Sequence, residues 1–517
     1  MRRSVSLLGL VTMLSVPLQH SYRCGSIADL WAAELNQQAM NQVALANNNF
    51  AVDLYRQLAP ENADKNLFFS PYSISSALTM TMEGARGETA QQMGTVLRFP
   101  EAARNTGVDA QELPWNTAVL HSDQARLRQH LIGGTDAGQN QKIKKQITQL
   151  EQEYQSLTKQ ITQLRAENQS SQLREVTQRS VAVANELNTL RQQVDQYELN
   201  IANALWAEQT FPFRAAFLKV LSDAYGAAAF PVDFLHKPEE ERDRINNWVA
   251  RQTKERITNL LAPGIITRNT RLVLTNAIYF KGNWADEFDK KDTQESAFTL
   301  QDGTTGKVML MSAHDKQWRY AEFFPDGTRN DPVLNQERFA YELKPNPDGF
   351  QLLALPYRGN ALTMAVLLPK RHDGLPAIEK QLTSTSLAKW LEALQQQKVH
   401  VFLPKFKLET LYSLPPTLTK MGMPAAFQAG GFTGMSDAPE AKLLALSEVV
   451  HKAFVEVNEE GTEAAAATAA VVSFTSARVE PPTPTFRADH PFLFLIRDNQ
   501  SGTILFLGRV LNPAPAQ

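Results

Sequence analysis

The sequence predicts an α+β protein built on antiparallel or mixed sheets. Short runs rich in β-branched and aromatic residues recur in the second half of the chain, and Gly, Pro, Asn or Asp stands at most of their boundaries. Segments with helical apolar spacing lie among these runs, without strict alternation of strand and helix. Clustered strands with segregated helices favour an α+β fold over a doubly wound α/β fold.

Residues 1–25 are predicted to be an export signal. Met1, Arg2 and Arg3 give a basic start, and the apolar run that follows is shorter than the ~20 residues of a membrane-spanning helix. An uncleaved amphipathic terminal segment is the alternative. No later stretch is long and apolar enough to span a bilayer. We therefore expect a secreted, extracellular protein, or a periplasmic one if the source is a Gram-negative bacterium.

The regular elements are expected in the following order. A helix is predicted over residues 35–59, where apolar residues keep helical spacing up to Pro60. A second helix is predicted over residues 242–254. The predicted strands occupy six runs, at residues 272–280, 350–357, 362–369, 398–408, 492–496 and 503–511.

Residues 138–197 differ in composition from the rest of the chain. This stretch holds fourteen glutamines and has no Pro or Gly after Gly138. Apolar residues alternate at spacings of four and three in two arms, which the polar stretch 168–172 separates. We predict an inserted antiparallel coiled-coil hairpin, although dimerisation through the same seams stays open. The hairpin is either a spacer or a docking arm for a partner or for self-association.

Composition and motifs exclude several function classes. The 517 residues include 52 Lys and Arg against 54 Asp and Glu, so no basic excess is left to bind nucleic acid. The single cysteine excludes an internal disulfide framework and any multi-thiolate metal site. The sequence has no catalytic elbow, zincin motif, Walker loop or dinucleotide fingerprint. We therefore expect no enzyme activity, no cofactor and no metal.

Residues 459–472 are unusual. Their alanine-rich run should form a helix by propensity alone. However, residues 473–486 are Pro-rich, lack helical periodicity and are predicted to be an exposed extended loop. As a strand, the run would place small or β-branched residues on one face from Thr462 onward, with Glu463 on the other face. Such a strand could slide over a packed core without overpacking it.

Four long segments carry a resemblance to a known family. They are residues 66–93, 274–284, 449–467 and 486–498, and with them the chain resembles a serpin over residues 45–100 and 197–517. The resemblance implies a fold of three β-sheets with a shell of helices and an exposed reactive loop at about 459–486. It divides the chain into serpin domain parts at 45–137 and 198–517, around the inserted hairpin at 138–197.

The resemblance also implies roles for residues of the loop. Residues 459–461 match the proximal hinge, and 462–470 match the segment that inserts into a sheet. The hinge residues so assigned are Glu459, Glu460, Gly461, Thr462, Ala464 and Ala466. Counting fourteen residues beyond Gly461 places the reactive bond at Thr475–Ser476. Arg478–Val479 is the rival bond, and it would suit a trypsin-like protease.

Other residues match the region where the family's sheet opens. These shutter residues are Ser70, Ser73, Asn276 and His451, and Trp284 matches a tryptophan where the loop first inserts. Buried polar groups of this kind must be hydrogen-bonded, so rearranging their bonds is one way to hold two sheet states close in energy. An ion pair between Lys307 and Glu459 is expected at the hinge.

The function that the resemblance implies is suicide inhibition of serine-type, and perhaps cysteine-type, endopeptidases. The cleaved loop would insert into the central sheet and trap the acyl-enzyme. The alternative is a non-inhibitory serpin-fold binding or adhesion protein that acts through its coiled-coil arm. The expected partner is therefore a target protease, with a further partner or a second copy at the hairpin in the alternative.

Overall fold

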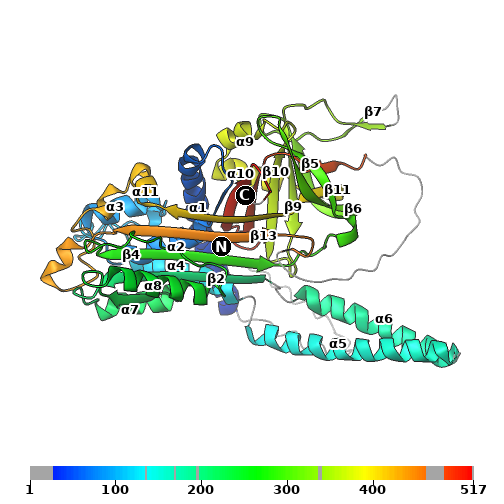
Figure 1. The fold of residues 1–517 in the computed structure, drawn as a ribbon, viewed down its shortest axis with the longest axis horizontal. Helices are drawn as coiled ribbons and strands as arrows, with labels where there is room; N and C mark the ends of the chain where they lie inside the picture. Colours follow the sequence, from blue (N-terminus) through cyan, green and yellow to red (C-terminus); the bar gives the residue numbers. More distant parts are fainter. Residues whose placement is uncertain are drawn as a thin grey trace, which may run out of the picture.

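The computed structural model describes residues 27–133, 137–167, 170–193, 197–335, 340–461 and 482–514. The predicted export signal and most of the predicted reactive loop lie outside these residues. The α+β prediction is confirmed, because the described chain combines eleven α-helices with sheets of nine, five and two strands (Figure 1).

The five-stranded sheet has the order β12-β13-β4-β2-β3. Its strands are β12 (Phe406–Ser413), β13 (Glu448–Val457), β4 (Leu272–Gly282), β2 (Tyr197–Glu208) and β3 (Ala228–Val232). The central pair, β13 and β4, is parallel, whereas β12 with β13 and β2 with β4 are antiparallel. Figure 1 shows β13, β4 and β2 running side by side along the long axis of the molecule.

The nine-stranded sheet has the order β1-β16-β15-β10-β9-β6-β11-β14, with β5 also paired to β6. Its strands are β1 (Leu67–Phe69), β5 (Gln294–Thr299), β6 (Thr305–Phe323), β9 (Phe350–Pro356), β10 (Leu362–Pro369), β11 (Gln395–Pro404), β14 (Thr485–Arg487), β15 (Phe492–Asp498) and β16 (Ile504–Val510). A small separate sheet pairs β7 (Val333–Asn335) with β8 (Ala340–Glu342).

Helices surround the sheets. They are α1 (Ile27–Glu61), α2 (Pro71–Met82), α3 (Gly87–Val96), α4 (Thr117–Gly133), α5 (Ala137–Ala166), α6 (Ser170–Gln193), α7 (Ala215–Val220), α8 (Pro238–Gln252), α9 (Leu375–Gln381), α10 (Ser384–Glu392) and α11 (Pro415–Met421). Ile245 and Val249 of α8 pack in one apolar cluster with β2, β4 and β13. Helix α2 contacts β2 and β4, with the side chain of Ser73 hydrogen-bonded to both strands. Because α8 packs on the opposite face, helices lie against both faces of the five-stranded sheet.

Two predicted elements differ from the structure. The predicted run 398–408 is two strands in different sheets, because β11 ends at Pro404 and β12 begins at Phe406. Proline has no backbone N–H to donate, and Lys405 donates its N–H to Met309 O across the break. The predicted helix 35–59 is longer, and Pro60 lies inside α1 instead of ending it.

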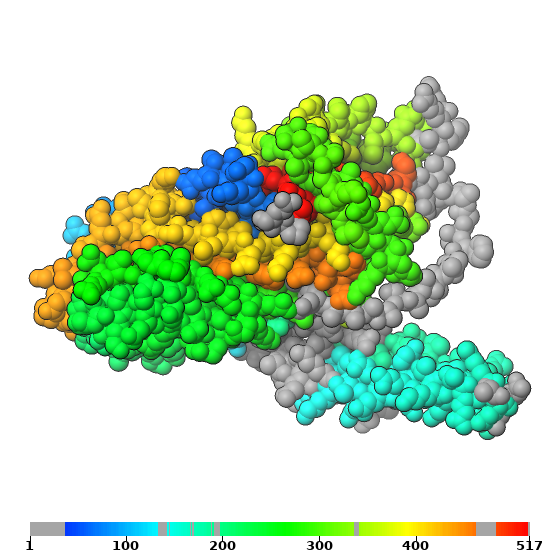
Figure 2. Space-filling model, viewed as in Figure 1, coloured from blue at the N-terminus to red at the C-terminus, as the bar shows by residue number. Residues whose placement is uncertain are grey.

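Helices α5 and α6 cover the two predicted arms of the insertion. Their contacts join Ile143, Ile147 and Leu157 of α5 to Val183 and Leu187 of α6 in one small apolar cluster. Arg179 of α6 adds an ion pair with Glu153 of α5 at 2.7 Å. Figure 2 shows this pair projecting from one end of the body. The assignment of the pair as a coiled coil stays a prediction.

None of the described helices is both long enough and apolar enough to cross a bilayer.

Candidate functional site

The turn after β13 is built around Gly461. Asn458 and Gly461 exchange backbone hydrogen bonds, with the Asn458 N–H donating to Gly461 O at 2.9 Å and the Gly461 N–H donating to Asn458 O at 3.2 Å. Gly461 has φ of 120°, and a Cβ there would lie 2.3 Å from Gly282 O and 2.6 Å from Trp284 N. Because any side chain would collide with the β4 backbone, this position requires glycine.

The same turn lies against the end of β4. Asn283 forms an antiparallel bridge with Gly461. The Trp284 N–H donates to Glu460 O at 3.0 Å, and the Phe288 N–H donates to Glu459 O at 2.9 Å. The chain that leaves β13 is therefore already paired, at its first residues, with the segment that follows β4. At Gly461 it runs in the antiparallel direction relative to that segment.

The buried side chain of Trp284 packs under this turn and is hydrogen-bonded to it. Its side chain is 1% exposed, its Nε1–H donates to Asn458 O at 3.0 Å, and its ring stacks on Tyr357 at a centroid distance of 4.7 Å. The structure thus brings Trp284 together with the predicted hinge residues Glu459, Glu460 and Gly461.

The two hinge glutamates are held by lysines from other segments. Glu459, which is buried, pairs with Lys405 at 2.9 Å, and Glu460 pairs with Lys290. Burial raises the pKa of Glu459, but hydrogen bonds from Lys405 and a backbone N–H, the nearby Thr293 hydroxyl and the charge of Lys405 together lower it by more, so the pKa lies below its usual value. The expected Lys307–Glu459 pair is wrong. Lys307 on β6 pairs across the β5–β6 ladder with Glu295 at 2.7 Å, because Ala297 on β5 is its register partner and Glu295 lies two residues away.

A row of polar side chains crosses the middle of the five-stranded sheet. His451 on β13 is the register partner of Asn276 on β4, and Asn276 is in turn the partner of Asn203 on β2. These three residues are buried, and so are Ser70 and Ser73 at the start of α2, which face the row. The structure therefore brings the four predicted shutter residues into one cluster.

Hydrogen bonds in the cluster fix one protonation state of His451. The Ser70 N–H donates to Nε2 of His451 at 3.1 Å, so Nε2 must carry a lone pair. Nδ1 must then carry the proton that His451 donates to Asn276 Oδ1. Complete burial lowers the pKa of His451 to about 3, which keeps the ring neutral near pH 7.

The hydrogen bonds continue from Asn276 into the rest of the cluster. Its Nδ2 donates to Ser73 Oγ at 2.5 Å and also to Asn203 Oδ1. Ser70 Oγ accepts from the Ser73 N–H at 3.1 Å and so caps α2. Each member therefore has a partner across the seam or on α2, as a buried polar cluster requires.

Three residues of the site were missed by the sequence analysis. Asn203 was the only one with a local signal, since it is an isolated amide in the apolar run 201–206. Lys405 and Lys290 gave no local signal, because their pairing with the hinge depends on how distant strands meet.

Seven of the predicted site residues lie outside the described residues. They are Thr462, Ala464 and Ala466 of the insertion segment and Thr475, Ser476, Arg478 and Val479 of the two candidate bonds.

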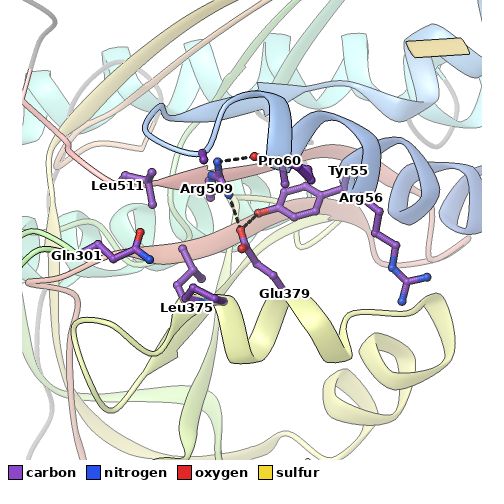
Figure 3. A pocket seen from close by; sticks show the side chains of 11 residues that line it. Tyr55, Arg56, Pro60, Gln301, Leu375, Glu379, Arg509 and Leu511 are labelled. Carbon is purple, nitrogen blue, oxygen red and sulfur yellow. Dashed lines mark hydrogen bonds and ion pairs between the residues drawn. The ribbon is translucent and has the colours of Figure 1, made fainter. Parts of the chain in front are cut away.

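A cavity of about 310 Å³ lies elsewhere, between α1, α9 and β16 (Figure 3). Its buried charges are already satisfied. Tyr55 donates to Glu379 at 2.5 Å, and Arg509 donates to Glu379 at 2.8 Å and to the carbonyls of Ala59 and Asn62. Burial raises the pKa of Tyr55 well above its usual value. We assign these residues a structural role, holding α1 and α9 against β16.

Comparisons with known proteins cover almost the whole chain. The family model described as "Serpin (serine protease inhibitor)" matches residues 45–513. Human Serpin B3 is 36% identical over 479 residues, which is 92% of this chain and all of that protein. Leukocyte elastase inhibitor A of Rattus norvegicus is 34% identical over 484 residues, with the same coverage.

Solved structures give the same result for the fold. Human thyroxine-binding globulin in complex with thyroxine has a TM-score of 0.65 at 26% identity, covering 92% of this chain and all of that one. Native protease nexin-1 with heparin has a TM-score of 0.65 at 24% identity and the same coverage.

Proposed function

The chain belongs to the serpin family, and from that premise we propose that it is a secreted suicide inhibitor of serine proteases. The observation that carries the proposal is the seam between β4 and β13. These central strands are parallel, and at Gly461 the turn after β13 bridges Asn283 in the antiparallel direction. Membership of the family supports the proposal that the chain inhibits proteases, and the seam supports the proposed way of trapping them.

A strand inserted at this seam would improve the pairing of the sheet. At Gly461 the backbone is antiparallel to the segment that follows β4, and β13 is parallel to β4. A new strand that continued in this direction between them would be antiparallel to both. One parallel pairing would be replaced by two antiparallel pairings, which are slightly more stable per residue.

The composition of the predicted insertion segment fits this role. Thr462, Ala464 and Ala466 would face one side of the new strand, and none of them is large or charged. Helices pack against both faces of the sheet, so small residues on the inserting face reduce the overpacking penalty.

The shutter cluster would act as the gate. His451 and Asn276 are direct partners across the seam, so an inserted strand must break their hydrogen bond. The two strands must move from one strand spacing to two, or about 4.8 Å further apart. Asn276 would keep Asn203 as a partner on its own side of the seam, and α2 would stay hydrogen-bonded to one of the two strands, through Ser73 to Asn276 or through Ser70 to His451. An inserted strand could therefore replace most of the hydrogen bonds that opening breaks.

Trapping follows from the order of chemical steps. The protease hydroxyl adds to the Thr475 carbonyl, the Thr475–Ser476 bond breaks, and a proton passes to the leaving amine of Ser476. An acyl ester between Thr475 and the protease remains. The fourteen residues from Gly461 to Thr475, laid down at about 3.4 Å each, would carry the ester roughly 48 Å along the sheet. Distortion of the protease there would stop hydrolysis, since small displacements of catalytic groups have large effects on rate.

The remaining features of the proposal come from the sequence. We place the reactive bond at Thr475–Ser476, with Arg478–Val479 as the rival, and the export signal at residues 1–25. The serpin domain then consists of residues 45–137 and 198–517, with residues 138–197 as an inserted hairpin. We also include cysteine proteases as a second target class, because the same acyl chemistry applies to a thiol.

Incubation with proteases tests the proposal. The full chain is mixed with chymotrypsin-like, elastase-like, trypsin-like and papain-like enzymes, and the products are separated in SDS and identified by mass spectrometry. We expect a covalent complex with at least one serine protease, and a released fragment that begins at Ser476. Complete cleavage by every enzyme, with no covalent complex, would refute the inhibitory function. A fragment that begins at Val479 would move the reactive bond to the rival position.

A further inference from the structure

Two histidines face each other on the nine-stranded sheet, far in sequence from one another. His314 lies on β6 and His400 on β11. Between the pairs Val399↔Lys316 and Val401↔Ala313 the register shifts, so two residues of β6 oppose His400. This is a β-bulge, and Asp315 in the bulge has a left-handed backbone conformation with φ of 55°. The bulge brings the two imidazole rings together at the surface of the sheet.

The distance between the rings decides what this pair can do. Nδ1 of His314 lies 3.4 Å from Nδ1 of His400. That is longer than the 2.7–3.2 Å typical of an N–H hydrogen bond. Two nitrogens bound tetrahedrally to one zinc ion, each at about 2.0–2.1 Å, would stand about 3.3–3.4 Å apart. The observed separation is therefore closer to that of a two-nitrogen chelate than to that of a hydrogen bond.

The surroundings leave room for further ligands. His314 is exposed and lines a cavity of about 240 Å³, together with Asp292 and Ser312. Its ring also meets Phe402 edge-on, at a centroid distance of 5.4 Å, which limits its rotation. Over the part of the chain with described side chains, no three His, Cys, Asp or Glu residues form a complete metal cluster. Water from the cavity would therefore supply the remaining ligands.

The positive charge of Arg487, which lines the cavity, is balanced by a carboxylate. Asp489 pairs with Arg487 at 2.8 Å, and the guanidinium lies over the Phe402 ring at 4.9 Å. Asp292 and Glu295 also line the cavity, and Glu295 is paired with Lys307. Asp315 follows His314 in the bulge and adds a further negative charge.

From this geometry we infer that His314 and His400 bind a divalent transition-metal ion that prefers imidazole, such as Zn²⁺ or Cu²⁺. The site is independent of the proposed inhibitory function. Imidazole is a good ligand for Zn²⁺, Cu²⁺ and Ni²⁺, whereas Mg²⁺ and Ca²⁺ prefer oxygen. By the Irving–Williams order, Cu²⁺ should bind more tightly than Zn²⁺.

The position of the site gives binding a structural consequence. The His400 N–H donates to Pro484 O at 2.9 Å, and His400 is the register partner of Thr485 on β14. Strand β14 has only three residues and lies at the edge of the sheet. A metal that ties His400 to His314 would hold β11 in the position that anchors β14.

A metal titration tests the inference. The full chain, freed of metal with a chelator, is titrated with Cu²⁺ or Zn²⁺ in competition with a chromophoric chelator. His314→Gln and His400→Gln each remove one ligand, and His236→Gln is the control, since His236 is also exposed but pairs with Asp233. We expect one equivalent to bind the wild type and the control equally. Loss of a residue that only hydrogen-bonds to a metal ligand typically weakens metal binding about 10- to 100-fold. Loss of His314 or His400, as a ligand itself, should weaken binding by at least that much.

A spectroscopic measurement keeps the test decisive if a variant misfolds. With one equivalent of Cu²⁺, the electron paramagnetic resonance spectrum of the wild type should show coupling to two imidazole nitrogens. Coupling to fewer than two nitrogens would overturn the inference. Unchanged affinity in both His314→Gln and His400→Gln, or an equal loss in His236→Gln, would also overturn it.

Discussion

Two seams between central strands of this molecule differ in strand direction and in the polarity of their paired side chains. The β10–β15 seam of the nine-stranded sheet is antiparallel, and its middle pairs are apolar, among them Met364↔Ile496 and Val366↔Phe494. The β4–β13 seam of the five-stranded sheet is parallel and carries the buried pair Asn276↔His451 in its middle.

The difference between the two seams indicates their roles. Separating apolar side chains loses their burial, and no incoming backbone can replace it. Separating a parallel, hydrogen-bonded pair loses directional bonds that a new strand can largely restore. We therefore expect the β4–β13 seam to open and the β10–β15 seam to stay closed.

A charge on the inserting face should abolish trapping. In Thr462→Arg, a buried, unpaired charge would have to enter the β4–β13 seam. We expect the variant to be cleaved as a substrate without forming an SDS-stable complex. Glu463→Arg is the matched control, because residue 463 would face the opposite side of the strand and already carries a charge in the wild type. Unchanged stoichiometry of inhibition in Thr462→Arg would show that the hinge is assigned wrongly.

Cleavage of the loop should raise the melting temperature. If the cut chain completes the five-stranded sheet, several kcal/mol of added stability would raise Tm by on the order of 10 °C or more in a chain of this size. The measurement is differential scanning calorimetry after limited proteolysis within residues 473–478. Cleaved Thr462→Arg should show a smaller rise. No rise in the cleaved wild type would mean that the native fold stores no such energy.

Substitutions in the two seams should separate stability from trapping. Met364→Ala removes a fully buried side chain from the closed seam and should cost about 2–5 kcal/mol of unfolding free energy. Asn276→Ala leaves the His451 Nδ1–H without an acceptor and should cost about 1–3 kcal/mol.

Only Asn276→Ala should change the fraction of protease that is trapped, measured as the stoichiometry of inhibition. Equal trapping in both variants would remove the distinction between the seams, because it would show that the polar pair has no special part in opening.

Acidification should weaken the polar seam through His451. Burial lowers its pKa to about 3 in the folded chain, whereas an unfolded histidine has a pKa of about 6.5. Between these values the unfolded chain binds more protons, so this contribution to stability is complete above pH 6.5 and is lost as the pH falls. From pH 7 to pH 5 the loss should be about 2 kcal/mol.

Urea unfolding at several pH values measures this loss. In His451→Gln the histidine contribution is absent, so the difference in unfolding free energy between wild type and variant should shrink by that amount between pH 7 and pH 5. A difference that does not depend on pH would mean that His451 titrates normally in the folded chain.

Deletion of the inserted hairpin should have the smallest effect. Its apolar cluster is separate from the cores of the body, so removal of residues 138–195 should leave the β4–β13 seam intact. We expect unchanged stoichiometry of inhibition and unchanged association rate with the target protease. Correct folding with lost inhibition would instead make the hairpin part of target recognition.

Local patterns in the sequence were sufficient for part of the fold. Heptad spacing predicted helical arms where α5 and α6 lie, and helical apolar spacing predicted most of α1. The six predicted strand runs coincide within a few residues with β4, β9, β10, β15 and β16 and, across the break at Pro404, with β11 and β12. The other described strands, among them β2, β6 and β13, were not predicted. The predicted features depend on neighbours within one or two turns, so the sequence is sufficient to show them.

Residues brought together by distant strands were harder to predict. Resemblance to a family suggested that Ser70, Ser73, Asn276 and His451 belong together, but no local pattern predicted it. The resemblance also suggested a wrong partner for Glu459, since the chain places Lys405 there and directs Lys307 to Glu295.

By itself, the sequence determined the conformational requirements of single positions and segments. It marked the glycine at 461, the small residues from 462 onward and the helical and extended runs, because each is a property of one residue or of its near neighbours. In contrast, the pairing of distant strands places Asn203 in the polar row, and a bulge between two such strands brings His314 to His400. Such pairs depend on the register between strands far apart in the chain, which the packing of the whole sheet fixes.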